Sequence, residues 1–348
     1  MAILLDEVNT VATKTIQPGI VDNYFKAGPL MAYLKKRFTR KWTGPLIQEN
    51  YEYAAMRGGA YKKGASFNTQ RRQTRTGMLF TPRYYQCNVT EFLEDLEVEM
   101  AGPTAMFSVL KADLANAALT LSAILEIAFF HHGQNVGGND RTAEINGLEE
   151  ALTDGTNVTW TGATFPTYGG QLRASVAPAL NSPVGLVGPS VTTTSFRMLE
   201  QSFQSCAIGA ERPKLGITTT RGMGFIAETF SPQQKIDVLD PEINWPGMKF
   251  NTATIVQSNY CPGADGVVDP DLGDYYNASE TFWWLNPGPV GDDAFIRLFI
   301  AASPKFAFGF TGFKGARDDN QVSGQILVAC NLTVRAPRLS RGLYGITK

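Results

Sequence analysis

The sequence predicts an α+β protein organised around one long helix and one long β-hairpin. The helix is predicted at residues 103–133, where apolar side chains recur at steps of three and four. The hairpin is predicted at residues 46–90, where two aromatic, partly alternating segments flank a basic, glycine-rich one. The 34 glycines and 19 prolines among 348 residues indicate many turns. Strands and loops are therefore expected to outnumber helices.

Composition limits the class of protein. A chain of 348 residues with 43% hydrophobic and 18% charged residues is typical of a soluble globular protein of about two domains. The first ten residues, MAILLDEVNT, lack the basic and apolar regions of a secretory signal. The four cysteines are far apart and form no CxxC pair, so neither a disulfide framework nor a metal site is expected. We expect no cofactor.

The net charge of −1 hides an uneven distribution along the chain. Residues 1–90 contain 14 Lys and Arg against 5 Asp and Glu, an excess of nine positive charges, whereas residues 91–348 contain 17 against 27, an excess of ten negative charges. A basic first quarter is compatible with nucleic-acid binding. Alternatively, the basic part of one copy contacts the acidic part of another, since oppositely charged patches steer association.

Residues 1–45 are interpreted as an N-terminal arm, because Pro–Gly and Gly–Pro pairs break its short apolar pieces. Residues 46–90 are interpreted as an extended-loop hairpin with strands at 46–56 and 78–92. Strands of that length extend roughly 36–40 Å, whereas a compact chain of this size has a radius of gyration of about 20 Å. The hairpin is therefore predicted to project from the body.

The hairpin is the predicted contact between copies. Its strands carry five aromatic rings with no evident partner in their own chain: Tyr51, Tyr53, Phe80, Tyr84 and Tyr85. Its tip is basic, with Lys62, Lys63, Arg71, Arg72 and Arg75, and the segment after it is acidic, with Glu91, Glu94, Asp95, Glu97 and Glu99. These two groups lie at opposite ends of a strand of roughly 40 Å. Pairing between different copies is therefore predicted rather than pairing within one chain.

The predicted helix begins at Pro103, which is tolerated in a first turn, and stops at Gly133. It would be roughly 43 Å long, and its charged residues argue against a membrane span. It belongs to a region at 91–150. A mixed region at 151–300 follows, with a helix at 195–209 and several short strands. The segment at 301–348 ends in one long closing strand.

The order of these elements resembles that of the tailed-bacteriophage major capsid protein family. Local stretches agree with the resemblance: GLEEAL followed by TYGGQLRAS, then MLEQSFQSCAIGAERPKLGITTTRGMGFIAE, and finally GQILVACNLTVRAPRLSRGLYGI. The resemblance implies a tailed-phage major capsid fold. In that fold the region 91–150 is a peripheral domain with a spine helix, the region 151–300 is an axial domain, and residues 301–348 return to the peripheral domain.

The resemblance also implies a function. Such a protein assembles with itself into the hexamers and pentamers of an icosahedral shell, which encloses double-stranded DNA without sequence-specific binding. The implied location is the virion, after assembly in the host cytoplasm, and the implied partners are a portal, a separate scaffolding protein and decoration proteins. The alternatives are the shell of an encapsulin-like protein nanocompartment and a basic-arm nucleic-acid-binding protein.

No residue pattern indicates an enzyme. His131 and His132 are adjacent, so on a helix they would point about 100° apart, and an interaction with the helix dipole is the preferred interpretation. The segment DGVVDPDLGD contains four aspartates, but it lacks the ligand order and the closing glutamate of an EF-hand. A solvated acidic loop is expected there. Of Trp283 and Trp284, we expect one buried and one at the rim of the core.

Overall fold

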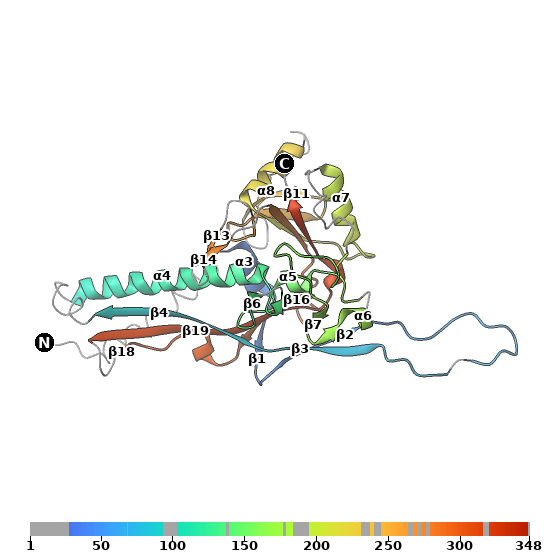
Figure 1. The fold of residues 1–348 in the computed structure, drawn as a ribbon, viewed down its shortest axis with the longest axis horizontal. Helices are drawn as coiled ribbons and strands as arrows, with labels where there is room; N and C mark the ends of the chain where they lie inside the picture. The colour runs from blue at the N-terminus through green and yellow to red at the C-terminus, as the bar shows by residue number, and fades with distance from the viewer. Residues whose placement is uncertain are drawn as a thin grey trace.

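The computed structural model is elongated, and Figure 1 shows two parts that extend in opposite directions from a central body, with a third part above it. The described residues are 28–67, 69–92, 103–136, 139–176, 179–183, 195–230, 237–239, 245–263, 267–269, 273–275, 279–315 and 320–346. A long helix and two long strands form one extension, and a hairpin forms the other.

The predicted spine helix is confirmed as α4, Pro103–Phe130, of 28 residues. Leu114, Leu121 and Leu125 are completely buried along its side. The stretch Asp113–Phe130 is long and apolar enough to cross a membrane by length and composition alone, but 67% of it is buried inside the protein. Such a degree of burial is typical of a helix in the core of a protein.

A long sheet lies alongside α4 and is built on β19, Gln321–Val334. One edge of β19 pairs antiparallel with β4 over ten residues, from Gln321 opposite Phe92 to Cys330 opposite Arg83. Its other edge pairs with β18 (Lys314–Gly315), β17 (Ala307–Phe310) and β16 (Ile296–Ala301), and β16 pairs in parallel with β1 (Thr39–Trp42). β4 spans Arg83–Phe92, and a short 3-10 helix, η3, spans Pro304–Phe306.

The alternation of side chains along β4 explains why this sheet has one buried and one open face. Val89 is buried, and its register partner on β19 is Gly324. Gln86, Asn88 and Thr90 point the other way and are exposed. The open face is therefore polar and uncharged in its middle.

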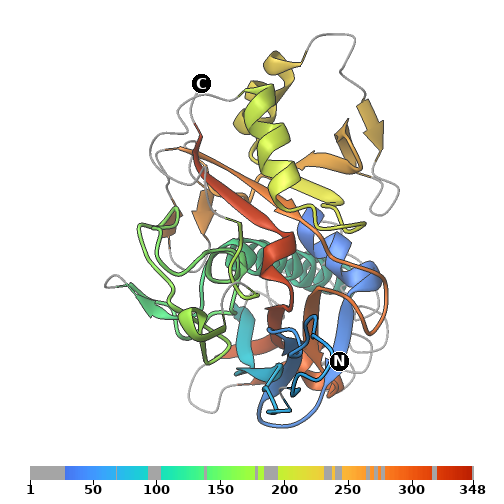
Figure 2. The same cartoon turned by 90° about the vertical axis from the view of Figure 1, so that its right-hand side faces the viewer.

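The upper part is a second sheet, in the order β10-β11-β12-β9-β15-β20, flanked by helices α7 and α8 (Figure 2). α7, Phe196–Ser205, is capped by Ser195, and α8, Thr220–Thr229, is capped by Thr219. The strand bounds are Asp237–Leu239 (β10), Pro246–Phe250 (β11), Ala253–Gln257 (β12), Leu215–Thr218 (β9), Glu280–Leu285 (β15) and Arg341–Ile346 (β20).

Both tryptophans of β15 are completely buried, so the expectation that one would lie at the rim is wrong. β15 lies between β9 and β20, and all six of its residues are buried. The Trp284 Nε1–H donates to Ser202 Oγ of α7 at 2.9 Å, and Trp283 packs against the Phe130 ring at the end of α4.

The closing segment is two strands instead of the single strand that was expected. β19 ends at Val334, a 3-10 helix η4 follows at Pro337–Leu339, and β20 then pairs with β15 in the other sheet. Pro337 has no N–H to give to a ladder, which favours a break at this point. Residues 301–348 thus contribute to both sheets.

Several short elements lie around α4, β19 and the root of the hairpin. They are α3 (Pro29–Arg37), β5 (Asn135–Val136), β6 (Asn139–Asp140), α5 (Leu148–Ala151), β7 (Thr167–Tyr168), β8 (Gln171–Leu172) and α6 (Arg173–Val176). A further two-stranded sheet, β13 (Val267–Asp269) and β14 (Gly273–Tyr275), lies between the upper part and α4 (Figure 1).

A buried carboxylate of the spine helix holds the start of α3. The Glu126 carboxylate accepts hydrogen bonds from the N–H groups of Leu30 at 3.0 Å and Met31 at 2.9 Å. Gly28 makes this possible, because a Cβ at that position would lie 2.3 Å from the Glu126 carboxyl carbon. Burial raises the pKa of Glu126 from 4.5 to about 7, and the two N–H donors oppose that rise.

We predict that Glu126→Gln changes how the stability of the subunit depends on pH. Because the folded-state pKa is raised, the contribution of Glu126 is fully present below pH 4.5 and is lost as pH rises through 7. Wild type should therefore lose about 2 kcal/mol relative to the variant between pH 5 and pH 8, given about 1.4 kcal/mol per pKa unit. Urea unfolding of dissociated subunits measures this, and parallel pH profiles would contradict it.

Candidate assembly interface

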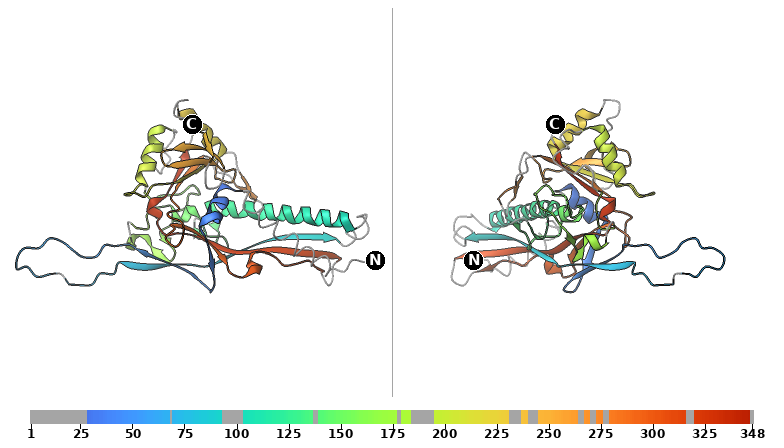
Figure 3. Two further views of the ribbon diagram at one scale, coloured as in Figure 1. Left: turned by 180° about the vertical axis from the view of Figure 1, so that it is seen from behind. Right: turned by 45° about the vertical axis from the view of Figure 1, so that its right-hand side comes forward.

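The predicted hairpin exists and projects from the body. β2, Ile47–Glu52, pairs antiparallel with β3, Arg75–Phe80. Residues 53–74 join them and are named here the hairpin loop. The Tyr53 N–H donates to the Thr74 carbonyl at 2.9 Å, and beyond this bond the described part of the loop has no strand. Figures 1 and 3 show it extending into solvent, away from every other element drawn.

The expected second strand of the hairpin, at 78–92, is wrong. The chain leaves β3 at Phe80, passes through Thr81 and Pro82, and begins β4 at Arg83. Pro82 cannot donate to a ladder and marks this break. β4 pairs with β19 and not with β2. The paired strands of the hairpin are six residues each, about 20 Å long, so the loop supplies the rest of the projection.

The aromatic residues of this region mostly have partners in their own chain, contrary to expectation. Phe80 is 2% exposed and packs edge-on against Tyr168, with ring centroids 5.3 Å apart. Tyr51 is buried, and the Tyr85 hydroxyl accepts a hydrogen bond from the Ile145 N–H at 2.9 Å. Tyr53 packs partly against the core. The partners of Phe80 and Tyr85, Tyr168 and Ile145, are distant in sequence, so local patterns did not reveal them.

A buried ionic cluster fastens the root of the hairpin to the body. Glu49 of β2 is 3% exposed, and both of its carboxylate oxygens lie 3.0 Å from Arg297 Nη1. Arg335 Nε lies 3.4 Å from the same carboxylate, and the Arg335 Nη2–H donates to the Asn50 carbonyl at 3.1 Å. The Thr333 hydroxyl donates to Glu49 at 3.3 Å. Sequence reasoning missed this cluster, although the alternation Ile47–Glu49–Tyr51 places Glu49 on the buried face.

The other strand of the hairpin is also fastened. The Leu79 N–H donates to the Gly169 carbonyl at 2.9 Å, and the Gln171 side chain donates to the Gly77 carbonyl at 2.9 Å. Gly169 has a φ of +55°, and a Cβ there would lie 2.7 Å from the Met78 Cβ. Both strands are thus held at the root, while the hairpin loop is not.

The hairpin loop is strongly basic. It contains no acidic residue, and its five cationic side chains are all exposed: Arg57, Lys62, Lys63, Arg71 and Arg72. Arg57 donates to Gln70 at 3.0 Å across the loop. Arg75, which was predicted at the tip, lies instead in β3 at the base of the loop, where its Nε is 2.5 Å from Glu52 Oε1. Its charge is therefore balanced within the chain.

The predicted acidic partner segment lies largely outside the described residues, since Glu94, Asp95, Glu97 and Glu99 are not among them. Glu91 is described and lies at the end of β4. That end of β4 and the hairpin loop lie at opposite ends of the long axis (Figure 1). Glu91 therefore cannot contact the loop of its own chain.

Two ring-bearing residues of the loop were overlooked in the sequence. Tyr61 and Phe67 are 68% and 67% exposed, and their ring centroids are 4.9 Å apart in an edge-to-face arrangement. They could have been predicted as contact residues, because they are two large apolar residues within a glycine-rich basic stretch.

The two histidines after α4 are buried and neutral, so the expected interaction of a charged histidine with the helix dipole is wrong. His131 packs on Trp160 and His132 on Phe165. Burial lowers the pKa of both, that of His132 to about 4. Across the described residues, no group of three or more His, Cys, Asp or Glu side chains forms a metal site.

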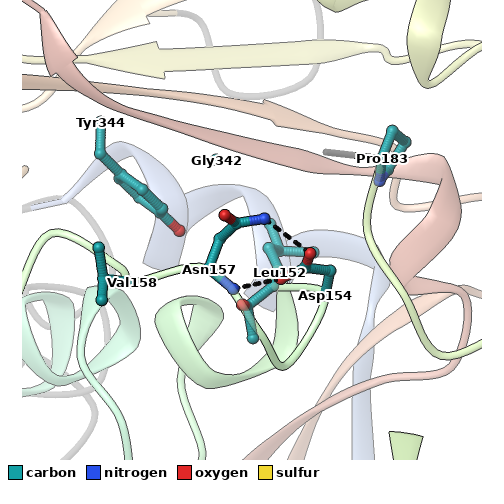
Figure 4. A pocket seen from close by; sticks show the side chains of 8 residues that line it. Leu152, Asp154, Asn157, Val158, Pro183, Gly342 and Tyr344 are labelled. Carbon is teal, nitrogen blue, oxygen red and sulfur yellow. Dashed lines mark hydrogen bonds between the residues drawn. The ribbon is translucent and has the colours of Figure 1, made fainter. Parts of the chain in front are cut away.

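A small cavity lies where β20 meets the loop after α5 (Figure 4). Its volume is about 10 Å³, the space of about one water molecule. The Asp154 carboxylate is already occupied, because it accepts hydrogen bonds from the N–H groups of Thr156 at 3.0 Å and Asn157 at 2.9 Å. This cavity is too small for an organic substrate.

This architecture also occurs in proteins of known structure. No protein-family model and no curated protein matches the sequence. Among solved structures, the capsid of cyanophage A-1(L) matches with a TM-score of 0.65 at 12% identity, over 92% of this chain and 93% of that one. The chain has the fold of a phage capsid protein. The predicted tailed-phage major capsid fold is thus confirmed.

Two further structures share this fold. The SrpI encapsulin of Synechococcus elongatus PCC 7942 matches with a TM-score of 0.57 at 11% identity, over 100% of this chain and 97% of that one. The capsid of a native GTA particle matches with a TM-score of 0.57 at 8% identity, over 89% and 88%. The same fold is therefore found in a cyanophage capsid, an encapsulin and the capsid of a GTA particle.

We predict that Glu49→Gln destabilises the subunit by about 3 kcal/mol, because it leaves Arg297 and Arg335 without their buried counter-charge. The matched control is Glu52→Gln, three residues along the same strand, where an exposed pair with Arg75 is broken at a cost of about 0–1 kcal/mol. Urea unfolding of both variants measures the difference. Equal losses would contradict the role given to Glu49.

Proposed function

We propose that this chain is the major capsid protein of a tailed phage, whose copies form the hexamers and pentamers of an icosahedral shell around double-stranded DNA. The observation that carries the proposal is a capsid fold with a projecting hairpin loop that has no partner surface among the described residues of its own chain. In this proposal the shell is the head of the virion. It assembles in the host cytoplasm with a portal, a separate scaffolding protein and decoration proteins.

The contact between copies is proposed to run head to tail. The basic hairpin loop of one copy meets the acidic segment that begins at Glu91 in the next, because the end of β4, where that segment begins, and the loop lie at opposite ends of the molecule. Such a contact repeats around a ring when the rotation closes. Each exposed ion pair contributes only about 0–1 kcal/mol, but repetition around a closed shell makes the sum decisive.

An encapsulin-like compartment is the second candidate. It is favoured by the match to SrpI, which covers 100% of this chain and 97% of that one. The contents of particles from the native source separate the two. Nuclease-protected duplex DNA supports a phage head, whereas particles that hold protein and no DNA support a compartment.

We predict that Arg71→Glu combined with Arg72→Glu leaves the subunit folded and raises the concentration needed for shell assembly at least tenfold. Reversing two charges turns attraction into repulsion at every copy of the contact. Sedimentation measures particle yield, and circular dichroism verifies folding. The control Arg71→Lys with Arg72→Lys keeps the charge and should assemble.

Rescue of this double variant by Glu94→Arg with Glu97→Arg would identify the acidic partner. If the variant with Arg71→Glu and Arg72→Glu forms normal shells, the proposed ionic contact between copies is contradicted. The proposal that the chain is a capsid protein is not affected by that result.

We also predict that the free subunit binds duplex DNA weakly, because its loop carries only five cationic side chains and therefore neutralises few phosphates. The measurement is the slope of log K against log salt concentration. A slope that corresponds to six or more phosphates would favour a nucleic-acid-binding protein instead.

A further inference from the structure

We propose that Tyr61 and Phe67 form an apolar anchor at the tip of the hairpin loop, and that this anchor binds Phe92 of a second copy. The proposal rests on the proposed shell function and deepens it. The anchor is the part of the contact between two copies that does not depend on charge.

The two rings are brought together by a tight turn between them. The Ala65 N–H donates to the Lys62 carbonyl at 2.9 Å, and Gly64 has a φ of +85°, which favours glycine. The chain therefore reverses between Tyr61 and Phe67, and their rings meet edge to face with centroids 4.9 Å apart. This contact gives an otherwise irregular loop a defined apolar tip.

The rings remain unusually open to solvent for a contacting pair. Each is about two-thirds exposed, and Met56 on the same loop is 72% exposed. Exposed apolar groups that gather at one point and are rimmed by charge mark interaction sites. Aromatic residues are the side chains that most often anchor such sites.

Phe92 is the matching surface at the other end of the molecule. It is 58% exposed at the last position of β4, opposite Gln321. Glu91, the residue before it, points to the other face of β4, but the sequence that follows Phe92 is acidic, with Glu94, Asp95, Glu97 and Glu99. The rings at the tip have Lys62 and Lys63 between them in the sequence. Apolar residues next to charges of opposite sign are therefore found at the two ends.

The other strongly exposed aromatic ring of β4 is a poorer candidate. Tyr84 is 64% exposed, but its ring already meets the ring of Phe306 in its own chain, at a centroid distance of 6.1 Å. It also lies at the start of β4, nearer to the body. The Tyr84–Phe306 pair thus provides a matched control: two exposed rings in mutual contact that are not at either end.

The first experiment locates the contact in assembled shells. Benzoylphenylalanine is placed at position 67, or at position 306 as control, in shells mixed from heavy- and light-isotope chains. We expect position 67 to cross-link between chains to tryptic peptide 84–111, which contains Phe92. Cross-links within one chain, or to a different peptide, would overturn the assignment.

The second experiment measures the concentration needed for assembly at 0.15 M and 1 M salt. Tyr61→Ser with Phe67→Ser should raise it at least tenfold at both salt concentrations, whereas Tyr84→Ser with Phe306→Ser should change it less than twofold. Circular dichroism verifies that each variant folds. Equal effects of the two double variants, or no effect of the tip variant, would overturn the anchor.

These results separate the anchor from the proposed function. If wild type forms no shells, the proposed function fails. If wild type and the tip variant form shells equally well, only the anchor fails. Vesicles containing phosphatidylglycerol test the other partner of an aromatic basic loop, and tip-dependent vesicle binding with unchanged assembly would overturn the proposal in favour of an anionic membrane.

Discussion

The strand pairing of β19 joins the two ends of the molecule. Over residues 321–330 it holds β4, which packs against α4, and on its other edge it holds β18, β17 and β16. Past that point, Asn331 donates from its Nδ2 to the Thr81 carbonyl at 2.7 Å, at the crossing from the hairpin into β4. The end of β19 then reaches Glu49 through Thr333. One strand therefore relates the spine helix to the hairpin.

Buried polar groups fix the junction around this strand. The Arg173 guanidinium is 1% exposed and donates to the carbonyls of Phe165 at 3.0 Å, Glu150 at 2.5 Å and Ala151 at 3.3 Å, so it satisfies the end of α5. The Val334 N–H donates to the Tyr168 hydroxyl at 2.9 Å, and the Tyr168 ring covers Phe80 at the root of the hairpin. Buried contacts therefore hold the root of the hairpin, whereas the hairpin loop has no such contacts. This arrangement would let the loop reach a defined position on a neighbouring subunit.

The sequence predicted the elements whose signals are local and missed the partners that are distant. The period of α4, the first strand of the hairpin and the helix α7 are all indicated by neighbouring residues. The partner of β4 is 229 or more residues away, so its aromatic alternation could not distinguish β2 from β19, although Pro82 marked the break. Glu49 was overlooked because a carboxylate is ordinarily exposed. Its burial follows only from Arg297 and Arg335, which the fold brings to it.

If the chain is a shell subunit, its hairpin loop finds its partner surface on another copy. Negative-stain electron microscopy of the purified protein tests this proposal. We expect closed particles of uniform size, with the free subunit present only as a minor species. A sample that contains only dispersed single chains, at every salt and protein concentration and with crowding agents, would contradict it.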